Sequence, residues 1–283
     1  MKNIILFPAV VFLLSVTVHA QGKKAEVVFF EDFSTGTLDR SKWNVIGPGF
    51  HVNDEQQAYV DSSLVITFIK GNAEGAKNGA LVIRPVFRKN AISFNGKTFD
   101  FLSGRIDTSE KVEFTYGTAA ARTKMNDASG LWPAFWALGN GDWPDTGEID
   151  IMEYVGEGDW TGVALHGPGY SGDTPLVNKY FFRKGTDATQ WHVYSVDWTE
   201  DALLFRIDGE LIYRATRPMV ENYGRWAFDN PKYLILNFAL GGAYPGKTNG
   251  VKEPYYGLPS STVDLIKQGD AKFMVDWVKI TKR

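Results

Sequence analysis

Residues 147–154 read GEIDIMEY, and this stretch decides which fold the chain can adopt. Segments rich in Gly and Asp flank it at 139–146 and 156–159, so the pattern predicts one short strand between two turns. The same pattern recurs along most of the chain, because short apolar or alternating runs end repeatedly at Gly, Asn, Asp or Pro. The predicted strands include 27–30, 63–69, 79–86, 112–116, 164–166, 192–198, 202–207, 234–239 and 272–280. An all-β protein is therefore expected.

The clearest turn and the one helical segment can also be placed from the sequence. Asp208-Gly209 is typical of a two-residue hairpin turn, since Gly adopts positive φ, and strands at 203–207 and 211–214 would flank it. Only Ser260 to Ile266, with a serine as the expected cap, has a pattern that favours a helix. No internal repeat or low-complexity linker interrupts the predicted strands. We expect a single β-sandwich of two antiparallel sheets.

The first twenty residues have the pattern of a cleavable signal peptide. Lys2 is followed by an apolar run from Ile4 to Val16 and by the small-residue site Val18-His19-Ala20. The apolar run is shorter than the roughly 20 residues that cross a membrane, and no later segment is apolar for that length. We therefore expect residues 1–20 to be removed, and residues 21–283 to form one domain that is secreted or periplasmic and has no membrane span.

Composition narrows the classes of partner. The formal charge of −3 gives no basic field of the kind that nucleic-acid binding requires. The chain has no cysteine, which excludes disulfides and a lipid-anchoring cysteine. Nine Trp, twelve Tyr and nineteen Phe suit a ring-shaped neutral ligand such as a sugar, although aromatic residues also fill sandwich cores. We expect a monomer.

The three acids of residues 147–154 are predicted to share one face of their strand. Alternate side chains of a strand point the same way, which places Glu148 beside Asp150. A β-bulge around Ile151 and Met152, one extra residue, would return Glu153 to that face. Carboxylates this close repel each other, so at least one stays protonated near neutral pH. The strand therefore combines ionised and protonated carboxyl groups.

Cleavage of a glycoside with retention of configuration needs that combination. One ionised carboxylate attacks the anomeric carbon, while a protonated carboxyl about 5–5.5 Å away donates to the leaving oxygen. We assign Glu148 as the nucleophile and Glu153 as the acid/base. Asp150 would orient Glu148 through a shared proton and raise the pKa of Glu153 through its charge.

Two alternatives bear on the same acids. Acids on a solvated strand face would carry no chemistry, but apolar side chains alternate with them and no Lys or Arg within the stretch neutralises them. Oxygen ligands suit calcium, whereas a catalytic zinc site would need histidines at motif spacing, and the mature chain has only His51, His166 and His192. We expect no cofactor for catalysis.

Four segments resemble glycoside hydrolase family 16, in its bulged-strand branch that contains laminarinases. They are Gly130 to Trp136 (GLWPAFW), Gly147 to Glu153 (GEIDIME), Trp191 to Tyr194 with Asp197-Trp198, and Leu236 to Gly242 (LNFALGG). The first two together are highly specific. The resemblance implies a jelly-roll sandwich with a carbohydrate-binding cleft across its concave face, retaining hydrolysis, and the roles given above for the three acids.

The resemblance also implies which side chains bind sugar. Trp136 and Trp143, twelve and five residues before the first glutamate, would bracket the sugar at the scissile bond. Trp132 shares the strand face of Trp136, so that one of the two could simply pack. Asn53 resembles the asparagine that contacts a glucose hydroxyl, and Arg105 resembles the arginine of the cleft.

Further positions are carried over in the same way. His166 resembles the histidine that forms a hydrogen bond near the acid/base, while His192 is assigned to packing. Tyr244, in a segment where many laminarinases have a Trp after Gly-Gly, would stack on the leaving-group side. Asp32 and Asp276 resemble ligands of a structural calcium ion on the convex face, and two solvated strand acids are the alternative.

The leading functional hypothesis is a secreted endo-acting enzyme that hydrolyses internal β-1,3 bonds of a laminarin-like β-glucan. Alternatives are a mixed-linkage β-1,3/1,4-glucanase, a galactan hydrolase of the agarase or carrageenase type, a β-glucan-binding module without catalysis, and a calcium-dependent lectin. Transglycosylation is also open to a retaining enzyme. Segments 140–146, 167–174 and 241–256 are expected to form the rim of the cleft, and loops of this kind set specificity.

Overall fold

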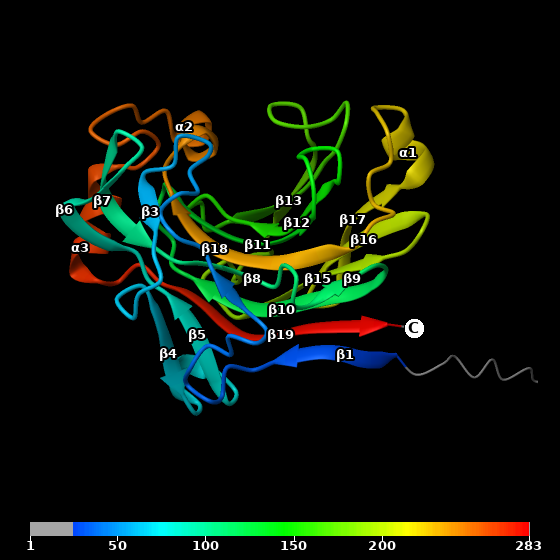
Figure 1. The fold of residues 1–283 in the computed structure, drawn as a ribbon, viewed down its shortest axis with the longest axis horizontal. Coiled ribbons are helices and arrows are strands. Elements are labelled where there is room, and N and C mark those ends of the chain that lie inside the picture. Colours follow the sequence, from blue (N-terminus) through cyan, green and yellow to red (C-terminus); the bar gives the residue numbers. More distant parts are fainter. Residues whose placement is uncertain (1–24, 283) are drawn as a thin grey trace, which may run out of the picture.

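The computed structural model describes residues 25–282, and most of its strands belong to two eight-stranded antiparallel sheets. The first sheet has the order β17-β16-β15-β10-β19-β5-β4, and β1 also pairs with β19. The second sheet has the order β14-β13-β12-β11-β18-β8-β2, and β9 also pairs with β18. Figure 1 shows β1 and β19 in one layer, with β11, β12, β13 and β18 in the layer above. The predicted all-β sandwich is confirmed.

The bounds of the elements are as follows. The first sheet contains β1 (Glu26–Glu31), β4 (Ile66–Lys70), β5 (Gly79–Ile83), β10 (Gly117–Met125), β15 (His192–Trp198), β16 (Ala202–Ile207), β17 (Glu210–Thr216) and β19 (Phe273–Lys282). The second contains β2 (Asn44–Val45), β8 (Arg105–Asp107), β9 (Glu113–Phe114), β11 (Leu131–Gly139), β12 (Glu148–Glu153), β13 (Trp160–His166), β14 (Leu176–Phe181) and β18 (Lys232–Leu240). A third sheet joins β3 (Gln57–Tyr59), β7 (Lys97–Ser103) and β6 (Val86–Phe94), and the helices are α1 (Arg217–Glu221), α2 (Ala243–Asn249), α3 (Ser260–Gln268) and the short 3-10 turn Ala73–Gly75.

The core lies between the two large sheets, and alternation of side chains builds it. In β15, His192, Tyr194, Val196 and Trp198 are buried, while the residues between them are partly exposed. This period of two is what a strand with one buried face requires. Each large apolar side chain buried in this way stabilises the fold by roughly 1.5–3 kcal/mol. The assignment of His192 to packing is confirmed, because its ring is buried and hydrogen-bonded to Asp208 and to the Asp187 carbonyl.

The structure also corrects parts of the predicted pattern. A third sheet with a parallel β3–β7 pair was not expected, and neither were α1 and α2, because 260–266 was the only helix predicted and α2 lies in a segment expected to be a loop. The helix predicted at 260–266 is present as α3, but its N-cap is Pro259 and no side chain caps it, so the serine cap is wrong.

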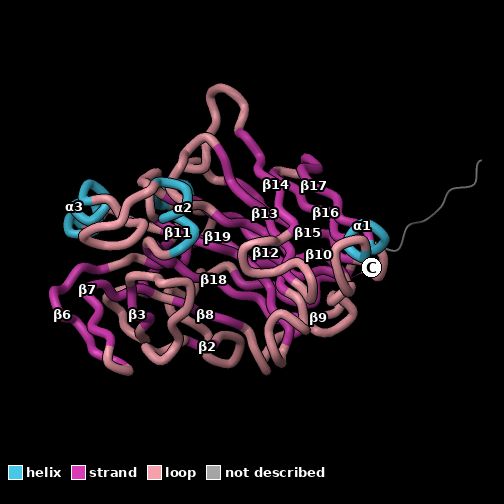
Figure 2. Tube along the Cα trace, turned by 90° about the horizontal axis from the view of Figure 1, so that it is seen from above, coloured by secondary structure: helices cyan, strands magenta, loops and turns pink. Residues whose placement is uncertain are grey.

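The hairpin turn at Asp208-Gly209 is confirmed, with φ of 51° and 85°. Figure 2, the view from above, shows β12, the strand that carries the three acids, next to β13 in the second sheet.

The predictions of a signal peptide and of a chain without a membrane span have different outcomes. The signal peptide predicted for residues 1–20 lies outside the described residues, and the domain bounds 21–283 stay a prediction. Within residues 25–282, no helix is long and apolar enough to cross a membrane.

The expected calcium ligands do not fit an ion site. Asp276 is buried on β19, where one carboxylate oxygen is 2.5 Å from the Arg122 guanidinium and the other accepts the Lys77 N–H at 2.8 Å. A calcium ion would have to displace that arginine. Asp32 accepts hydrogen bonds from Ser34 N–H and from the Asn78 side chain. The two acids therefore act in this structure as anchors for neighbouring backbone and side chains.

The buried Arg122–Asp276 pair should contribute strongly to stability. Asp276→Ala would leave the guanidinium of Arg122, which is 17% exposed, without its partner, and we expect the free energy of unfolding to fall by about 3–5 kcal/mol. Asp145→Asn is the matched control, because its pair with Arg225 is exposed and should change stability by less than about 1 kcal/mol. Urea unfolding of both variants measures the difference, and equal effects would refute the assignment.

A chelator should leave the thermal unfolding midpoint unchanged. The reason is that the Asp276 carboxylate is already occupied by Arg122 and Lys77. Calorimetry with EDTA and with added calcium tests this expectation. A midpoint that falls with EDTA and recovers only with calcium would restore the ion site suggested by the family resemblance.

Candidate active site

The bulge predicted in β12 is present and gathers the three acids. On the β11 side, Trp136 pairs with Asp150 and Phe135 pairs with Met152, so Ile151 is an extra residue. On the β13 side the register shifts between Asp150 and Glu153. A bulge of this kind changes which face the following side chains point to. Glu153 therefore joins the face that carries the earlier acids, which we call the carboxyl face.

Each glutamate on the carboxyl face accepts a hydrogen bond from one indole. Trp143 Nε1 donates to Glu148 Oε2 at 2.9 Å, and Trp132 Nε1 donates to Glu153 Oε1 at 3.1 Å. An indole N–H can only donate, so each bond favours an acceptor carboxylate and holds it in one orientation. Trp143 and Trp132, both predicted to bind sugar, therefore also orient the two glutamates.

Burial raises the pKa values of all three acids. Burial and the charge of Glu153 raise the pKa of Glu148 to about 7, although the Trp143 hydrogen bond and Arg105 act against this shift. Burial raises the pKa of Glu153 to about 7 against the Trp132 hydrogen bond. Asp150 has its pKa raised well above the ordinary value by burial and by both glutamates. The site therefore keeps protons up to neutral pH, as acid/base chemistry requires.

One reason given from the sequence needs correction. The charge of Asp150 was expected to raise the pKa of Glu153, but burial of Glu153 itself is the cause. Asp150 is almost fully buried, and its Oδ2 has no hydrogen-bond partner among the described residues. A buried carboxyl group without a partner is held in its neutral form. Asp150 is thus a proton carrier beside Glu148 rather than a fixed negative charge.

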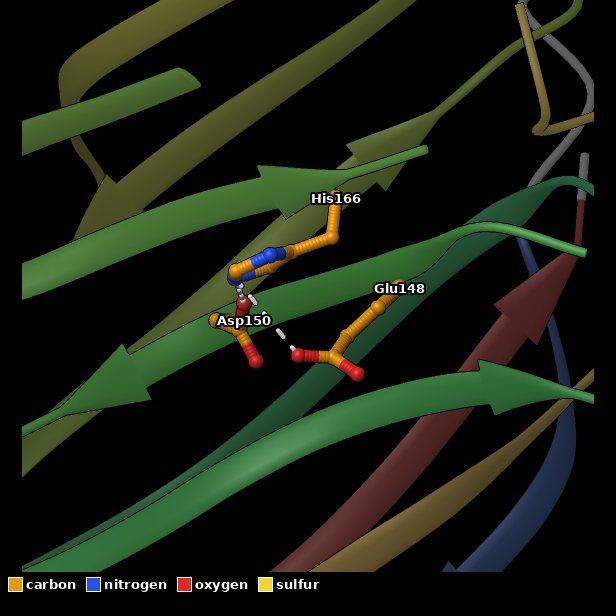
Figure 3. Close-up of side chains that lie close together, drawn as sticks. All are labelled: Glu148, Asp150 and His166. Atoms are coloured by element: carbon orange, nitrogen blue, oxygen red, sulfur yellow. Dashed lines mark ion pairs between the residues drawn. The ribbon is translucent and has the colours of Figure 1, made fainter. Parts of the chain in front are cut away.

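His166 lies on β13 beside the first two acids, not beside Glu153 as the resemblance suggested. Its Nε2 is 3.6 Å from Glu148 Oε1 and 3.5 Å from Asp150 Oδ2. Figure 3 shows the three side chains with their polar ends close together. Burial lowers the pKa of His166 to about 4, so the imidazole is neutral.

The same three residues are the one group within residues 25–282 that could surround a metal ion. Their candidate ligand atoms all lie within 4.8 Å of one another. A metal-binding histidine normally donates its second ring nitrogen to an outer partner, whereas His166 Nδ1 is buried without one. The group therefore fits a proton-sharing cluster better than an ion site.

A buried polar chain supports Trp136 from below. Trp136 Nε1 donates to Asn237 Oδ1 at 2.7 Å, and Asn237 donates to the Tyr59 hydroxyl at 3.0 Å. Tyr59 in turn donates to Glu55, which also accepts from Gln57. Burial raises the pKa of Glu55. The chain fixes the ring plane of Trp136, because each member is hydrogen-bonded to the next.

Arg105 is held between two rings on the same side of the site. Its guanidinium lies 4.1 Å from the Phe50 ring centroid and 4.9 Å from that of Trp136. The side chain is almost fully buried, and its charge lowers the pKa of Glu148. Arg105 therefore acts as a fixed positive charge near the candidate nucleophile, as well as a candidate sugar contact.

Tyr244 and Asn53 occupy the side of the site that α2 covers. The Tyr244 ring packs edge-on against Trp132, with 5.5 Å between centroids. Burial, followed by the charge of Glu153, raises the pKa of Tyr244, which lies near the acid/base. Asn53 has a φ of 56° and its carbonyl accepts the Ala243 N–H at 2.7 Å, while its side chain is exposed. Its backbone anchors α2, and its amide is available to a ligand.

Sequence reasoning missed four supporting residues: Phe50, Glu55, Tyr59 and Asn237. A signal existed for Asn237, because it is the one amide among the apolar residues 234–240, a run that predicts a buried strand. A buried amide in such a strand needs a partner. The partners come from 55–59 and 136, far away in the chain, and the sequence gives no rule that joins these positions.

Comparison with known proteins agrees with the geometry. The family model "Glycosyl hydrolases family 16" matches residues 49–278. A β-glucanase of Rhodothermus marinus is 32% identical over 237 residues, which cover 78% of each protein. The glucan endo-1,3-β-glucosidase A1 of Niallia circulans is 29% identical over 78% of this chain, and the match spans only 34% of that longer protein. The laminarinase catalytic domain of Thermotoga maritima MSB8 has a TM-score of 0.76 and 30% identity, with 92% of this chain and 99% of that domain covered.

Removal of one carboxyl should stabilise the protein at alkaline pH. The pKa of Glu153 is raised from 4.5 to about 7 on folding, so the folded state binds more protons than the unfolded state between these values. Stability must then fall as pH rises through this window. We expect Glu153→Gln to raise the unfolding midpoint by a few degrees at pH 8 and to have little effect at pH 4.5.

Glu210→Gln is the matched control for this experiment, because Glu210 forms an exposed pair with Arg183. Calorimetry at both pH values measures the effect. An equal change in midpoint at pH 8 and pH 4.5 would show that the gain does not come from the raised pKa.

Proposed function

Because this chain belongs to glycosyl hydrolases family 16, we propose that it is a retaining endo-β-1,3-glucanase that cleaves internal bonds of a laminarin-like glucan. The observation that carries the proposal is the pair of indole-held glutamates on one bulged strand, with a protonated Asp150 between them. The named relatives include a glucan endo-1,3-β-glucosidase and a laminarinase. The signal-peptide pattern supports export, and we expect the exported enzyme to work as a monomer.

The surroundings of the two glutamates support distinct roles. Arg105 and the Trp143 indole both favour the ionised form of Glu148, whereas only the Trp132 indole favours the ionised form of Glu153. The pKa values of both glutamates are raised to about 7, so we assign the shared proton to Glu153 on the ground that Arg105 and Trp143 stabilise the carboxylate of Glu148. This distribution makes Glu148 the nucleophile and Glu153 the proton donor.

The reaction then proceeds in two displacements. In the first, a Glu148 oxygen forms a bond to the anomeric carbon as the glycosidic C–O bond breaks, and Glu153 gives its proton to the leaving oxygen. In the second, Glu153 removes a proton from water, and the water oxygen displaces Glu148 from the anomeric carbon. Asp150 keeps its proton beside Glu148. It therefore adds no negative charge that would repel the ionised glutamates.

A neutral glucan suits the charges on the carboxyl face. Arg105 is packed between Phe50 and Trp136, and its charge is directed to Glu148, so it is poorly placed to pair with a sulfate group. Trp136, fixed by Asn237, and Trp143, which is 48% exposed, supply rings for a pyranose. This arrangement favours β-glucan over the sulfated galactans.

The roles can be tested by replacing each glutamate and supplying azide. With an aryl β-glucoside oligomer as substrate, Glu148→Ala should lose activity by on the order of 10³-fold or more, and azide should restore turnover with the α-glycosyl azide as product. Glu153→Ala plus azide should give the β-glycosyl azide, because the glycosyl-enzyme intermediate still forms. The opposite pairing of variants and products would exchange the two roles.

Substrate class is tested with laminarin, barley glucan, agarose and carrageenan, followed by chromatography of the products. Oligosaccharides from laminarin, absent with Glu148→Gln, are the expected result. Products from barley glucan alone, or from agarose or carrageenan alone, would keep the mechanism and refute the substrate. Binding to laminarin without any product would refute the hydrolase proposal in favour of a recognition module.

A further inference from the structure

Lys232, at the start of β18, is buried completely inside the sandwich. Its ammonium group lies 5.6 Å from the Trp198 ring centroid and 5.8 Å from that of Phe228. Leu234, the next residue on the same face, belongs to the core. An apolar side chain would fit these surroundings at no desolvation cost, whereas an ammonium group needs several acceptors there.

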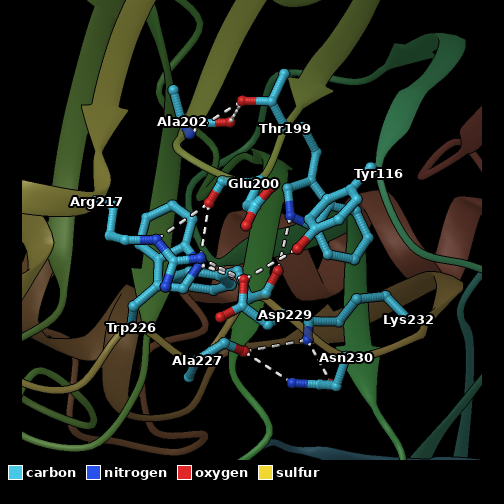
Figure 4. Close-up of polar contacts among 12 residues, drawn as sticks. Tyr116, Thr199, Glu200, Ala202, Arg217, Trp226, Ala227, Asp229, Asn230 and Lys232 are labelled. Atoms are coloured by element: carbon cyan, nitrogen blue, oxygen red, sulfur yellow. Dashed lines mark hydrogen bonds and ion pairs between the residues drawn. The ribbon is translucent and has the colours of Figure 1, made fainter. Parts of the chain in front are cut away.

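Three oxygens supply those acceptors. Lys232 Nζ donates to the Thr146 carbonyl at 2.6 Å, to Asn230 Oδ1 at 2.8 Å and to the Ala227 carbonyl at 3.3 Å. Figure 4 shows Lys232 with the contacts to Asn230 and Ala227 beside the Arg217–Asp229 pair. The ammonium group thus joins two separate segments, 227–230 and the loop that ends at Thr146. Joining the two segments through one nitrogen atom needs a donor with several hydrogens, which lysine provides.

The second of these segments carries Trp143. Thr146 N–H donates to the Asp142 carbonyl at 3.3 Å, and Gly147 N–H donates to the Pro144 carbonyl at 2.9 Å. The Thr146 hydroxyl also donates to the Gly139 carbonyl at 3.3 Å. Trp143 lies inside this closed loop, so the position of its backbone depends on where Thr146 is held.

The loop and segment 227–230 are packed closely around the ammonium group. A Cβ atom at Gly139 would lie 2.5 Å from Asn230 Oδ1, and one at Gly147 would lie 2.4 Å from the Ala227 carbonyl oxygen. Such approaches leave room for glycine alone. The other side-chain links of the loop are the Asp145–Arg225 pair and the hydrogen bonds of Asn140 with Ser109 and Glu113. All of them are exposed and contribute little. Lys232 is therefore the buried attachment of the Trp143 loop.

The geometry points to Lys232 as a positioning residue for catalysis: by holding Thr146 it keeps the Trp143 indole hydrogen-bonded to Glu148. This role rests on the proposed function only for its effect on turnover. The structural part, that Lys232 fixes Trp143, stands on the described contacts. Since the Trp143 hydrogen bond lowers the pKa of Glu148, loss of Lys232 should also move the pKa of the nucleophile upward.

A double-mutant cycle between Lys232 and Trp143 tests the inference. Lys232→Met should lower kcat/KM about 10-fold, Trp143→Phe by about 10–100-fold, and the double variant no further than Trp143→Phe alone. The acidic limb of the kcat/KM profile should move to higher pH in both single variants. Effects that multiply, or an unmoved acidic limb, would show that Lys232 acts on stability alone and would overturn the inference.

Lys111→Met is the matched control. Lys111 also donates to two backbone carbonyls, those of Arg40 and Trp43, but holds no segment of the carboxyl face. We expect it to leave the pH profile unchanged. If Lys232→Met fails to fold, Asn230→Ala removes one of the three acceptors and enters the same cycle with Trp143→Phe, with the same outcomes deciding.

A measurement without substrate separates this inference from the proposed function. The indole N–H resonance of Trp143, assigned by its absence in Trp143→Phe, should shift and exchange faster with water in Lys232→Met. An unchanged resonance would overturn the positioning role even if the enzyme cleaves glucan. A changed resonance in a protein that cleaves no glucan would keep the positioning role and refute the proposed function.

Discussion

One extra residue in β12 is the constraint on which the rest of the site depends. Without the bulge at Ile151, regular alternation would turn Glu153 toward the core, where an unpaired carboxyl is strongly unfavourable. With it, three acids share one face and repel one another. The neighbouring groups reduce that repulsion. Two indoles donate hydrogen bonds to the glutamates, the positive charge of Arg105 stabilises the Glu148 carboxylate, and Asp150 stays protonated.

The side chains that support this cluster lie on two sides of it. On one side, Trp136 is tied to Asn237 and through it to Tyr59 and Glu55. On the other, the loop that carries Trp143 is attached to the sandwich interior through the Lys232 ammonium group. The rings of Trp136 and Trp143 are therefore held in place, because the Nε1–H group of each donates a hydrogen bond to an acceptor of the protein. Rigid rings of this kind bind a ligand without a further entropic cost of ordering.

The sequence predicted the sandwich and the three acids because both follow from local rules. Alternation identified β15 and β16 to the residue, and the bulge in β12 followed from the need to place Glu153 with the other acids. What it could not supply were partners distant in the chain. The link from Glu55 to Trp136, the pair of Arg122 with Asp276, and the position of His166 beside Glu148 depend on strand order, which periodicity does not encode. The α2 helix was missed because Gly and Pro in residues 242–246 indicate a loop by composition.

The place of β19 in the first sheet has a consequence for the order of folding. This strand, residues 273–282, lies between β10 and β5 and also pairs with β1, so it joins segments from the beginning and the middle of the described chain. The first sheet cannot close until residue 282 has left the ribosome. Non-local pairing of this kind makes folding slow. A chain still being synthesised therefore lacks the strand that joins β1, β5 and β10.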